Sequence, residues 1–247
     1  MRRFFIPGEL TDSVAITGPD ARHIGKVLRL GPGAEIIVVD ETGRAARAEI
    51  TAVEATAVYA AVREALAADH EPPVAVTLAQ GLPKGDKFEY IVQKAVELGA
   101  AAIWPLACEN CTVRYDAAKQ GSRRERWQKI AAEAAKQCGR DAVPAVAPVR
   151  APAAALAEAG AATEIIMLYE GQGGEPLREI LAGSGASSYL LLIGPEGGFS
   201  PAEVELCRAR GARVATLGPR ILRTETAALA ALAIVMYEKG DLGSSGR

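Results

Sequence analysis

The apolar run at residues 189–193 (YLLLI) limits the fold more than any other stretch. It shows no polar alternation, which is typical of a strand covered on both faces, as in parallel sheets flanked by helices. The glycine-rich stretch 194–199 (GPEGGF) follows, and then Ser200-Pro201-Ala202-Glu203. Ser200 as N-cap, Pro201 at the first helical position and Glu203 three residues later predict a helix that opens with a capping box.

A second stretch, residues 217–227 (LGPRILRTETA), leads into the apolar run 228–237. It predicts a strand end, a turn at Gly218-Pro219 and then a buried helix. Thr224 or Thr226 is expected to cap this helix, and Glu225 suits its positive N-terminal end. Two such loops at the carboxyl ends of neighbouring strands predict a ligand site there, as in open α/β sheets.

From residue 74 onward, predicted strands alternate with predicted helices, which indicates a largely parallel sheet with helices on both faces. The alanine-rich stretch 151–162 reads as a helix or a loose crossover. The expected strands are 74–79, 101–106, 164–168, 189–193 and 213–217, and the expected helices are 87–98, 123–138, 176–181, 201–210 and 225–239.

The first 70 residues differ, because short β-rich pieces separated by turn residues dominate them. Strands are expected at 14–17, 35–39, 47–53 and 56–63, with one short helix from Asp20, as its cap, through Leu28. This pattern predicts a small β-barrel-like domain. Residues 67–73 look like a linker, so we expect two domains, 1–70 and 73–247.

The chain of 247 residues has a net charge of −2, so any nucleic-acid contact must come from a local patch. Residues 112–140 hold eight Lys or Arg against three acids, and residues 1–31 hold five against three. Solvated helix faces are the simpler interpretation of each segment alone. Two basic segments beside a glycine-rich ligand site nevertheless favour a polyanionic partner.

The four cysteines do not indicate a disulfide scaffold in a chain this long. Cys108 and Cys111 form a lone CxxC and the chain has two histidines, so no metal site is expected. No apolar stretch is long enough to span a membrane, and the start lacks a signal-peptide pattern. We therefore expect a cytoplasmic protein without a membrane partner.

The motifs IGPEGGFS (193–200) and LGPRILRTETA (217–227) resemble the signature of the SPOUT superfamily of methyltransferases. Within it, the chain is most similar to the bacterial 16S rRNA (uracil-N3)-methyltransferase family. Further matching stretches occur in the same order along nearly the whole chain: RRFFIP (2–7), HIGKVLRLGPG (23–33), KGDKFEYIVQKAVELG (84–99), RWQKIAAEAAKQCGR (126–140) and GDLG (240–243).

The resemblance implies an α/β SPOUT-type parallel sheet with a C-terminal trefoil knot, preceded by a small PUA-like β-barrel domain that binds RNA. It implies S-adenosylmethionine (SAM) as the cofactor and a homodimer as the assembly. The implied activity is methylation of N3 of a specific uridine in 16S rRNA of the small ribosomal subunit.

The cofactor is expected at three loops, where backbone groups between apolar walls can recognise an adenine. Neither a P-loop nor a complete GxGxxG motif occurs, which argues against the other common nucleotide sites. The expected cofactor-binding residues are Leu168, Tyr169, Glu170, Ile193, Gly194, Pro195, Glu196, Gly197, Leu217, Gly218, Arg220, Ile221, Leu222, Thr224 and Ala227.

Three residues are candidates for the chemistry. Arg223 is placed to stabilise a developing uracil anion or to hold a phosphate, and Glu196 or Glu225 to accept the N3 proton or to orient an arginine. Glu225 has an equally simple role as a helix-start residue that balances the helix dipole. Arg220 has a simpler role as well, in an ion pair that closes the turn at Gly218-Pro219.

The expected RNA contacts are basic residues at the chain start and near the predicted sheet edge: Arg2, Arg3, Lys26, Arg29, Lys84, Lys87 and Arg114. One departure from the family follows the second strand of the sheet, where Ser-Glu-Arg is common and this chain has Cys108-Glu109-Asn110, so that Asn110 replaces an arginine. Arg114 is a candidate substitute for it.

Two other functions also fit the sequence. One is a SPOUT methyltransferase for another RNA or another base position, and the other is a non-catalytic RNA-binding assembly factor. Intact GPEGG and LRTET motifs argue against the second, and affinity for the cofactor would separate the enzyme from the binding protein.

Overall fold

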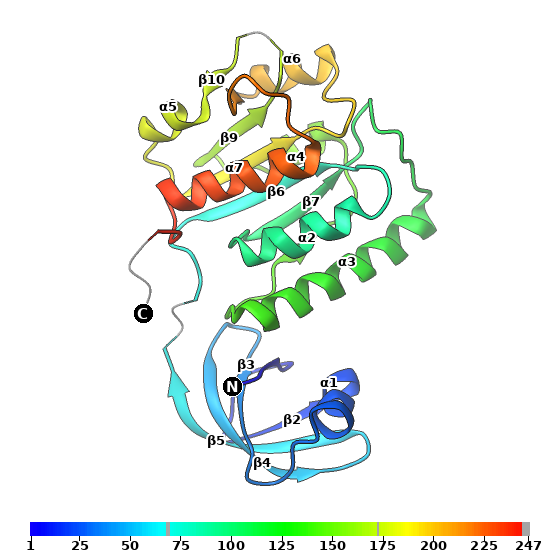
Figure 1. Ribbon diagram of the computed structural model, residues 1–247, viewed down its shortest axis with the longest axis vertical. Helices are drawn as coiled ribbons and strands as arrows, with labels where there is room; N and C mark the ends of the chain where they lie inside the picture. The colour runs from blue at the N-terminus through cyan, green and yellow to red at the C-terminus, as the bar shows by residue number, and fades with distance from the viewer. Residues whose placement is uncertain (68–69, 172, 244–247) are drawn as a thin grey trace. The chain divides into compact units, whose positions relative to one another are not determined.

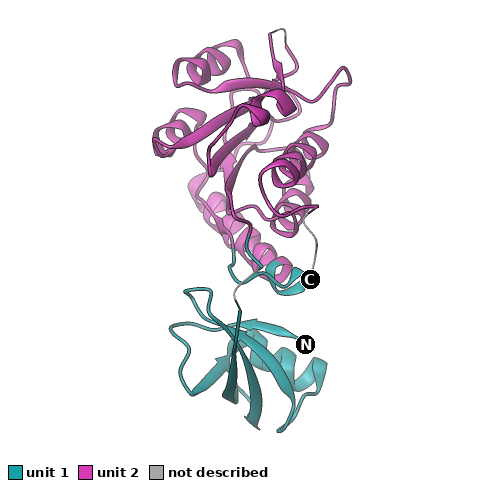
Figure 2. Ribbon diagram, turned by 90° about the vertical axis from the view of Figure 1, so that its left-hand side faces the viewer, with its two compact units in different colours: residues 1–71, 135–143 teal, residues 72–134, 144–247 magenta. Residues whose placement is uncertain are grey.

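The computed structural model describes residues 1–67, 70–171 and 173–243, which divide into two compact units (Figure 2). Unit 1 comprises Met1–Glu71 and Ala135–Val143, and unit 2 comprises Pro72–Ala134 and Pro144–Arg247. The segment Ala135–Val143, which the sequence places in the second domain, therefore packs with the first.

Unit 1 is built on a five-stranded sheet in the order β1-β3-β4-β5-β2. Strand β1 runs parallel to β3, and the other neighbours are antiparallel. Alternating side chains of these strands, such as Val14 and Ile16, are buried on one face with Ile24, Ile36 and Ile50. The strands are β1 (Arg3–Phe5), β2 (Ser13–Thr17), β3 (Glu35–Val39), β4 (Ala45–Val53) and β5 (Ala57–Leu66).

The short helix of unit 1 begins earlier than expected. It consists of α1 (Gly18–Arg22) followed by η1 (His23–Leu28), which has π-helical hydrogen bonding. Pro19 lies in the first turn, where its fixed φ favours a helix start, and Thr17 takes the N-cap position. The prediction of Asp20 as the cap was wrong, because its carboxylate instead accepts a hydrogen bond of 2.8 Å from Nζ of Lys136.

One buried and one partly exposed ion pair tie the segment Ala135–Val143 into unit 1. The guanidinium of Arg3 pairs with Asp141 and donates to the carbonyl of Arg140 at 2.9 Å. Arg140 in turn pairs with Glu71. Arg3 and Asp141 are 7% and 2% exposed, so this contact is largely removed from solvent.

Unit 2 contains a seven-stranded sheet in the order β10-β12-β9-β11-β6-β7-β8, and every neighbouring pair is parallel. Its strands are β6 (Ala75–Gly81), β7 (Ala102–Leu106), β8 (Ala145–Val146), β9 (Thr163–Leu168), β10 (Glu175–Pro176), β11 (Ser188–Ile193) and β12 (Arg213–Thr216). Its helices are α2 (Lys87–Glu97), α3 (Ala117–Cys138, whose last turn belongs to unit 1), α4 (Pro152–Glu158), α5 (Leu177–Ala182), α6 (Pro201–Ala209) and α7 (Thr224–Glu238).

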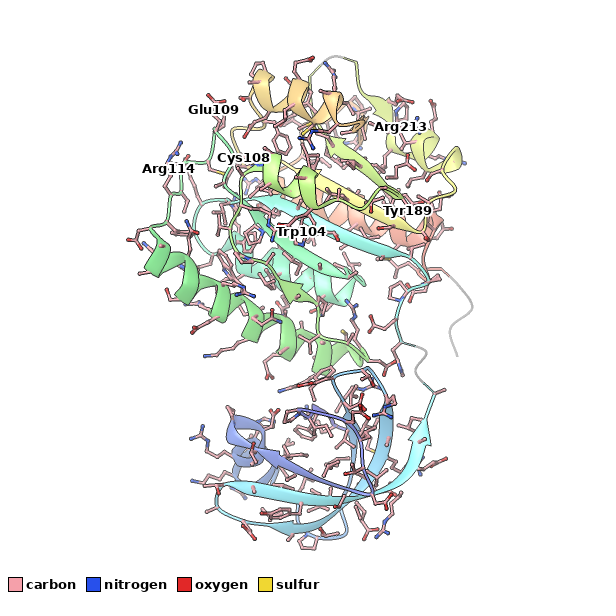
Figure 3. The ribbon with its side chains drawn as sticks, turned by 180° about the vertical axis from the view of Figure 1, so that it is seen from behind. Trp104, Cys108, Glu109, Arg114, Tyr189 and Arg213 are labelled. Atoms are coloured by element: carbon pink, nitrogen blue, oxygen red, sulfur yellow. The ribbon has the colours of Figure 1, made fainter. Side chains whose placement is uncertain are left out.

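Helices cover both faces of this sheet. Helices α2 and α7 lie on one face, and α4 and α6 lie on the other, as the front and back views show (Figures 1 and 3). Strand β11 is central, and residues 189–193 are all buried. The predicted α/β architecture is thus confirmed, with a parallel sheet in unit 2 and a small β-rich unit 1. The trefoil knot and the closure of unit 1 into a barrel stay predictions.

Three short strands, one helix start and one strand pairing differ from the sequence prediction. The strands before the two predicted loops, β11 and β12, were expected to be neighbours, but β9 lies between them. Strands β1, β8 and β10 have two or three residues each and carry no usable periodicity. Helix α3 begins at Ala117 rather than at residue 123. The carboxylate of Asp116 accepts a hydrogen bond of 2.8 Å from the backbone N–H of Lys119, which satisfies one free donor of the first turn.

Candidate cofactor and methyl-transfer site

Three loops at the carboxyl ends of β9, β11 and β12 surround a cavity of about 510 Å³ in unit 2. Parallel strands end at the same edge of the sheet, so these loops meet although they are far apart in sequence. The cavity is lined by Lys87, Leu168, Tyr169, Glu170, Ile193, Gly194, Pro195, Glu196, Gly198, Phe199, Ala215, Thr216, Leu217, Gly218, Pro219, Arg220, Ile221, Leu222, Arg223, Thr224 and Ala227.

The loop after β11 is fixed by the helix that follows it. The hydroxyl of Ser200 accepts from the backbone N–H of Glu203 at 3.2 Å, and the Glu203 carboxylate accepts from the N–H of Ser200 at 2.9 Å. This is the predicted capping box. The second oxygen of Glu203 accepts from the N–H of Glu109 at 2.8 Å, so the cap also anchors the segment after β7.

Gly197 is the one expected cofactor residue outside the cavity lining. Its carbonyl accepts a hydrogen bond of 3.0 Å from Nδ2 of Asn110. The residue that departs from the family pattern therefore braces the outer side of the GPEGG loop. Arg114 is exposed, and its Nη2 lies 3.4 Å from the carbonyl of Glu109; Figure 3 shows both Glu109 and Arg114 at the outer edge of this segment.

The loop after β12 has exposed side chains at the rim of the cavity. Arg223 is the N-cap residue of α7 and is exposed, and Ile221 is 81% exposed. Among the residues that the structure describes, the side chains of Arg220 and Arg223 form no hydrogen bond and no ion pair. The ion pair considered for Arg220 is therefore absent from the described part of the chain.

The predicted cap of α7 was wrong. Thr224 is the first residue of the helix rather than its N-cap, and Thr226 lies inside it. The hydroxyl of Thr224 is directed to the core instead, where it donates to the carbonyl of Gly194 at 2.6 Å. The end of β11 and the start of α7 are thus joined directly.

Lys87 is a cavity residue that the sequence assigned to RNA. Its Nζ lies 3.2 Å from Oε1 of Glu196 and 3.2 Å from Oε2 of Glu225. These two carboxylates raise the pKa of Lys87. For Glu196, partial burial opposes ionisation, but hydrogen bonds from its own N–H, from the N–H of Lys84 and from Lys87 outweigh it and lower its pKa.

The other expected RNA residues divide by exposure. Arg2, Lys26, Arg29 and Lys84 are exposed. Arg3 is corrected, because it is buried in its ion pair with Asp141 and presents no charge to a partner.

Four of the eight basic residues in the segment 112–140 form ion pairs with acids of their own unit. Arg123 and Arg126 pair with Glu89, and Arg124 donates to the carbonyl of Val146. Lys136 and Arg140 pair with acids of unit 1. Ion pairing therefore takes up four of the eight charges that favour an RNA-binding patch in this segment.

The CxxC cysteines are buried just after β7. The hydrogen bond with Cys111 and the loss of solvent raise the pKa of Cys108, and burial raises the pKa of Cys207 to about 11. Within residues 1–67, 70–171 and 173–243, no group of three or more His, Cys, Asp or Glu side chains has the geometry of a metal site. In the same residues, no helix is both long and apolar enough to cross a membrane.

Five further cavity residues adjoin those expected from the sequence, namely Gly198, Phe199, Ala215, Thr216 and Pro219. Their position beside the predicted loops was the available signal. Gln80 donates hydrogen bonds to the cavity residues Thr224 and Gly194, and nothing in the sequence indicated this, because a lone glutamine at a strand end is common.

The chain belongs to the RNA methyltransferase family. Residues 70–236 match the family model described as an RNA methyltransferase domain, and residues 16–62 match the RNA methyltransferase PUA domain. Among curated relatives, the ribosomal RNA small subunit methyltransferase E of Bacillus subtilis is 39% identical, and the match covers 96% of this chain and 97% of that protein. The protein of the same name from Mycobacterium bovis is 32% identical, with coverage of 91% and 87%.

Solved structures agree with this assignment. The ribosomal RNA small subunit methyltransferase E from Neisseria gonorrhoeae, bound to SAM, superposes with a TM-score of 0.89 at 35% identity, covering 98% of this chain and 99% of that one. A protein from Legionella pneumophila in complex with SAM superposes with a TM-score of 0.86 at 33% identity, with coverage of 97% and 98%.

Proposed function

We propose that this protein transfers a methyl group from SAM to N3 of a specific uridine in 16S rRNA of the small ribosomal subunit. The observation that carries the proposal is the cavity at the ends of β9, β11 and β12, because it lies in the domain that matches the RNA methyltransferase family. The printed names of the B. subtilis and N. gonorrhoeae relatives support small-subunit rRNA as the substrate. Uridine N3 as the acceptor follows from the motif resemblance.

The residues present fit SAM. A cavity of about 510 Å³ lies within the usual range for small-molecule sites. Its walls combine apolar side chains, such as Ile193 and Leu222, with the backbone of glycine-containing loops. That combination suits an adenine, and the exposed polar rim suits a ribose and an amino-acid carboxylate. When bound, SAM supplies an electrophilic methyl group on its sulfonium.

We propose that Arg223 stabilises the negative charge that develops on the uracil as N3 loses its proton. Arg223 lies on the cavity at the N-cap of α7, where the helix dipole also favours negative charge. Its guanidinium has no partner among the described residues, so no internal ion pair must break before it acts.

The two candidate proton acceptors differ in their surroundings. The lowered pKa of Glu196 makes it a weaker base than an ordinary glutamate. We therefore propose that Glu196 holds Lys87 in place, which leaves Glu225 as the proton acceptor. Lys87 lies 3.2 Å from both carboxylates, so it links the two roles.

We propose that RNA is held by the exposed basic residues Arg2, Lys26 and Arg29 of unit 1 and by Lys84 and Arg114 of unit 2. The PUA-domain match over residues 16–62 supports an RNA-binding role for the domain 1–70, with the chemistry in 73–247. The homodimer implied by the motif resemblance also remains part of this proposal.

Equilibrium binding tests the proposal against a non-catalytic assembly factor. Isothermal titration of the full chain with S-adenosylhomocysteine (SAH) is expected to give one saturable site with micromolar or tighter affinity. If the folded protein binds small-subunit rRNA but not SAH, the proposed enzyme activity is overturned and a non-catalytic RNA-binding factor is favoured.

A further inference from the structure

Gln80 joins two of the three cavity loops from beneath. It is the second-last residue of β6, is fully buried, and lies opposite Ile193 in the ladder with β11. Its Nε2 donates to Oγ1 of Thr224 at 2.8 Å. The same nitrogen lies 2.8 Å from the carbonyl of Gly81 and 3.4 Å from that of Gly194.

Thr224 continues this chain of hydrogen bonds. Its hydroxyl accepts from Gln80 and donates to the carbonyl of Gly194 at 2.6 Å. Thr224 and Gly194 both line the cavity, whereas Gln80 is not among its lining residues. The network therefore runs from the end of β6 to the start of α7 and back to the end of β11, and it sets the spacing of two loops that no covalent connection fixes.

The backbone around Gln80 leaves little freedom for these loops. A Cβ placed on Gly81 would lie 2.6 Å from both the nitrogen and Cδ of Pro195. The 194–195 segment thus packs directly on the main chain at the end of β6. Gln80 and Thr224 then supply the directional contacts that plain packing lacks.

Stability alone does not account for a glutamine at this position. Oε1 of Gln80 is buried and has no hydrogen-bond partner among the described residues. An unsatisfied buried amide oxygen is destabilising, and an apolar side chain of similar shape would avoid it. A buried amide that carries such a cost is expected where a geometry has to be held.

We propose that Gln80 is a positioning residue for the cofactor site, acting through the Thr224 hydroxyl on the Gly194 loop. The proposal rests on the SAM site of the preceding section. In it, Gln80 touches neither cofactor nor RNA and holds two backbone loops at the separation that binding requires. The hydrogen-bonded carbonyl of Gly194 is committed to this network, so recognition of adenine falls to other backbone groups of the loops.

The test compares Gln80→Met with Gln128→Met in the full chain. Gln128 lies on α3, and its side chain also makes two hydrogen bonds within unit 2, to Pro144 and Val146 at 3.1 and 2.8 Å. Both variants lose buried or half-buried polar contacts. We expect Gln80→Met to weaken SAH binding at least tenfold by isothermal titration, and Gln128→Met to lower the melting temperature with the SAH Kd within twofold of wild type.

Thr224 provides a second route that does not depend on Gln80→Met folding. Thr224→Val keeps the shape and removes the hydroxyl, so it should weaken SAH binding to a similar degree, and Thr224→Ser should restore it. Both residues act in one network, so their effects should not add. The SAH Kd of the double variant Gln80→Met, Thr224→Val should therefore lie within about twofold of the Kd of the single variant that binds SAH less tightly.

The outcomes separate this inference from the proposed function. If wild type binds SAH and both Gln80→Met and Thr224→Val bind it with unchanged Kd, the positioning role is overturned and the enzyme stands. If wild type itself does not bind SAH, the cofactor site fails and the inference fails with it.

Discussion

Nζ of Lys87 lies 3.2 Å from Oε1 of Glu196. Lys87 begins α2 and Glu196 is on the loop after β11, while the same ammonium also pairs with Glu225 of α7. One cation therefore connects three separate elements at the cavity. The sequence presents these residues as an RNA contact and two candidate bases, and the structure pairs them with one another.

Replacing Lys87 tests this connection. Lys87→Met leaves two carboxylates facing each other at the cavity without a cation, so both the loop and the start of α7 should shift. We expect kcat/KM for methyl transfer to fall about 100-fold, comparable to losing one preorganised charge contact. Lys87→Arg should retain much of the activity. Lys129→Met, which removes an exposed lysine of α3, is the matched control and should behave like wild type.

The pH dependence of catalysis tests the role of Glu196. The pKa of Glu196 is lowered, so its carboxylate is fully ionised above the usual glutamate pKa of about 4.3. The contacts of the ionised form are lost only as the pH falls through the lowered pKa. The raised pKa of Lys87 preserves the cation up to at least about pH 10, beyond which rising pH removes it. Between about pH 5 and pH 10 the pair should stay ionised.

Glu196→Gln should therefore lower the rate without moving any limb of the kcat profile between pH 6 and 9. Single-turnover rates at saturating SAM and RNA provide the measurement. An ascending limb near neutral pH that is present in wild type and lost in Glu196→Gln would identify Glu196 as the proton acceptor and contradict the assignment to Glu225.

Arg223→Ala tests stabilisation of the uracil anion. Arg223 lies on the cavity rim, and its backbone rather than its side chain caps α7, so the helix should form normally without the guanidinium. We expect the single-turnover rate to fall about 100-fold. The Kd values for SAH and for RNA, measured separately, should change by less than about threefold. Full single-turnover methylation with normal RNA binding would remove Arg223 from the chemistry.

Gly194→Val tests whether the GPEGG loop forms the cofactor site. A Cβ at Gly194 would lie 3.1 Å from the Cα and carbonyl carbon of Gly198 and 3.2 Å from the nitrogen of Phe199, so the loop must move. We expect SAH binding to weaken at least tenfold. Gly185→Val is the control, because a Cβ there meets nothing within 4 Å. Equal SAH affinity in the two variants would place the cofactor elsewhere.

Local sequence signals predicted those parts of the structure that depend on neighbouring residues. Ser200 and Glu203 form the expected capping box, because both halves of that motif lie within four residues. The fully apolar run 189–193 became the central buried strand β11 for the same reason. The sequence also indicated most residues that line the cavity, because the carboxyl ends of parallel strands lie at one edge of the sheet.

Long-range contacts account for the residues that the sequence misplaced. Threonine is a common helix N-cap, but the hydroxyl of Thr224 donates instead to the carbonyl of Gly194, thirty residues away in sequence. Arg3 reads as a basic RNA contact, and Asp141 neutralises it in the core of unit 1. Gln80 could not be recognised, because its partners come from the ends of two other elements.

The most direct test of the central claim is identification of the methylated nucleoside. Purified protein and labelled SAM would be incubated with small ribosomal subunits, and separately with naked 16S rRNA, from cells that lack the endogenous modification. The product would be digested and analysed by mass spectrometry. We predict N3-methyluridine at a single 16S site. Methyl on another nucleoside or another RNA would contradict the proposed substrate, and no transfer to any RNA by protein that binds SAH would contradict the proposed activity.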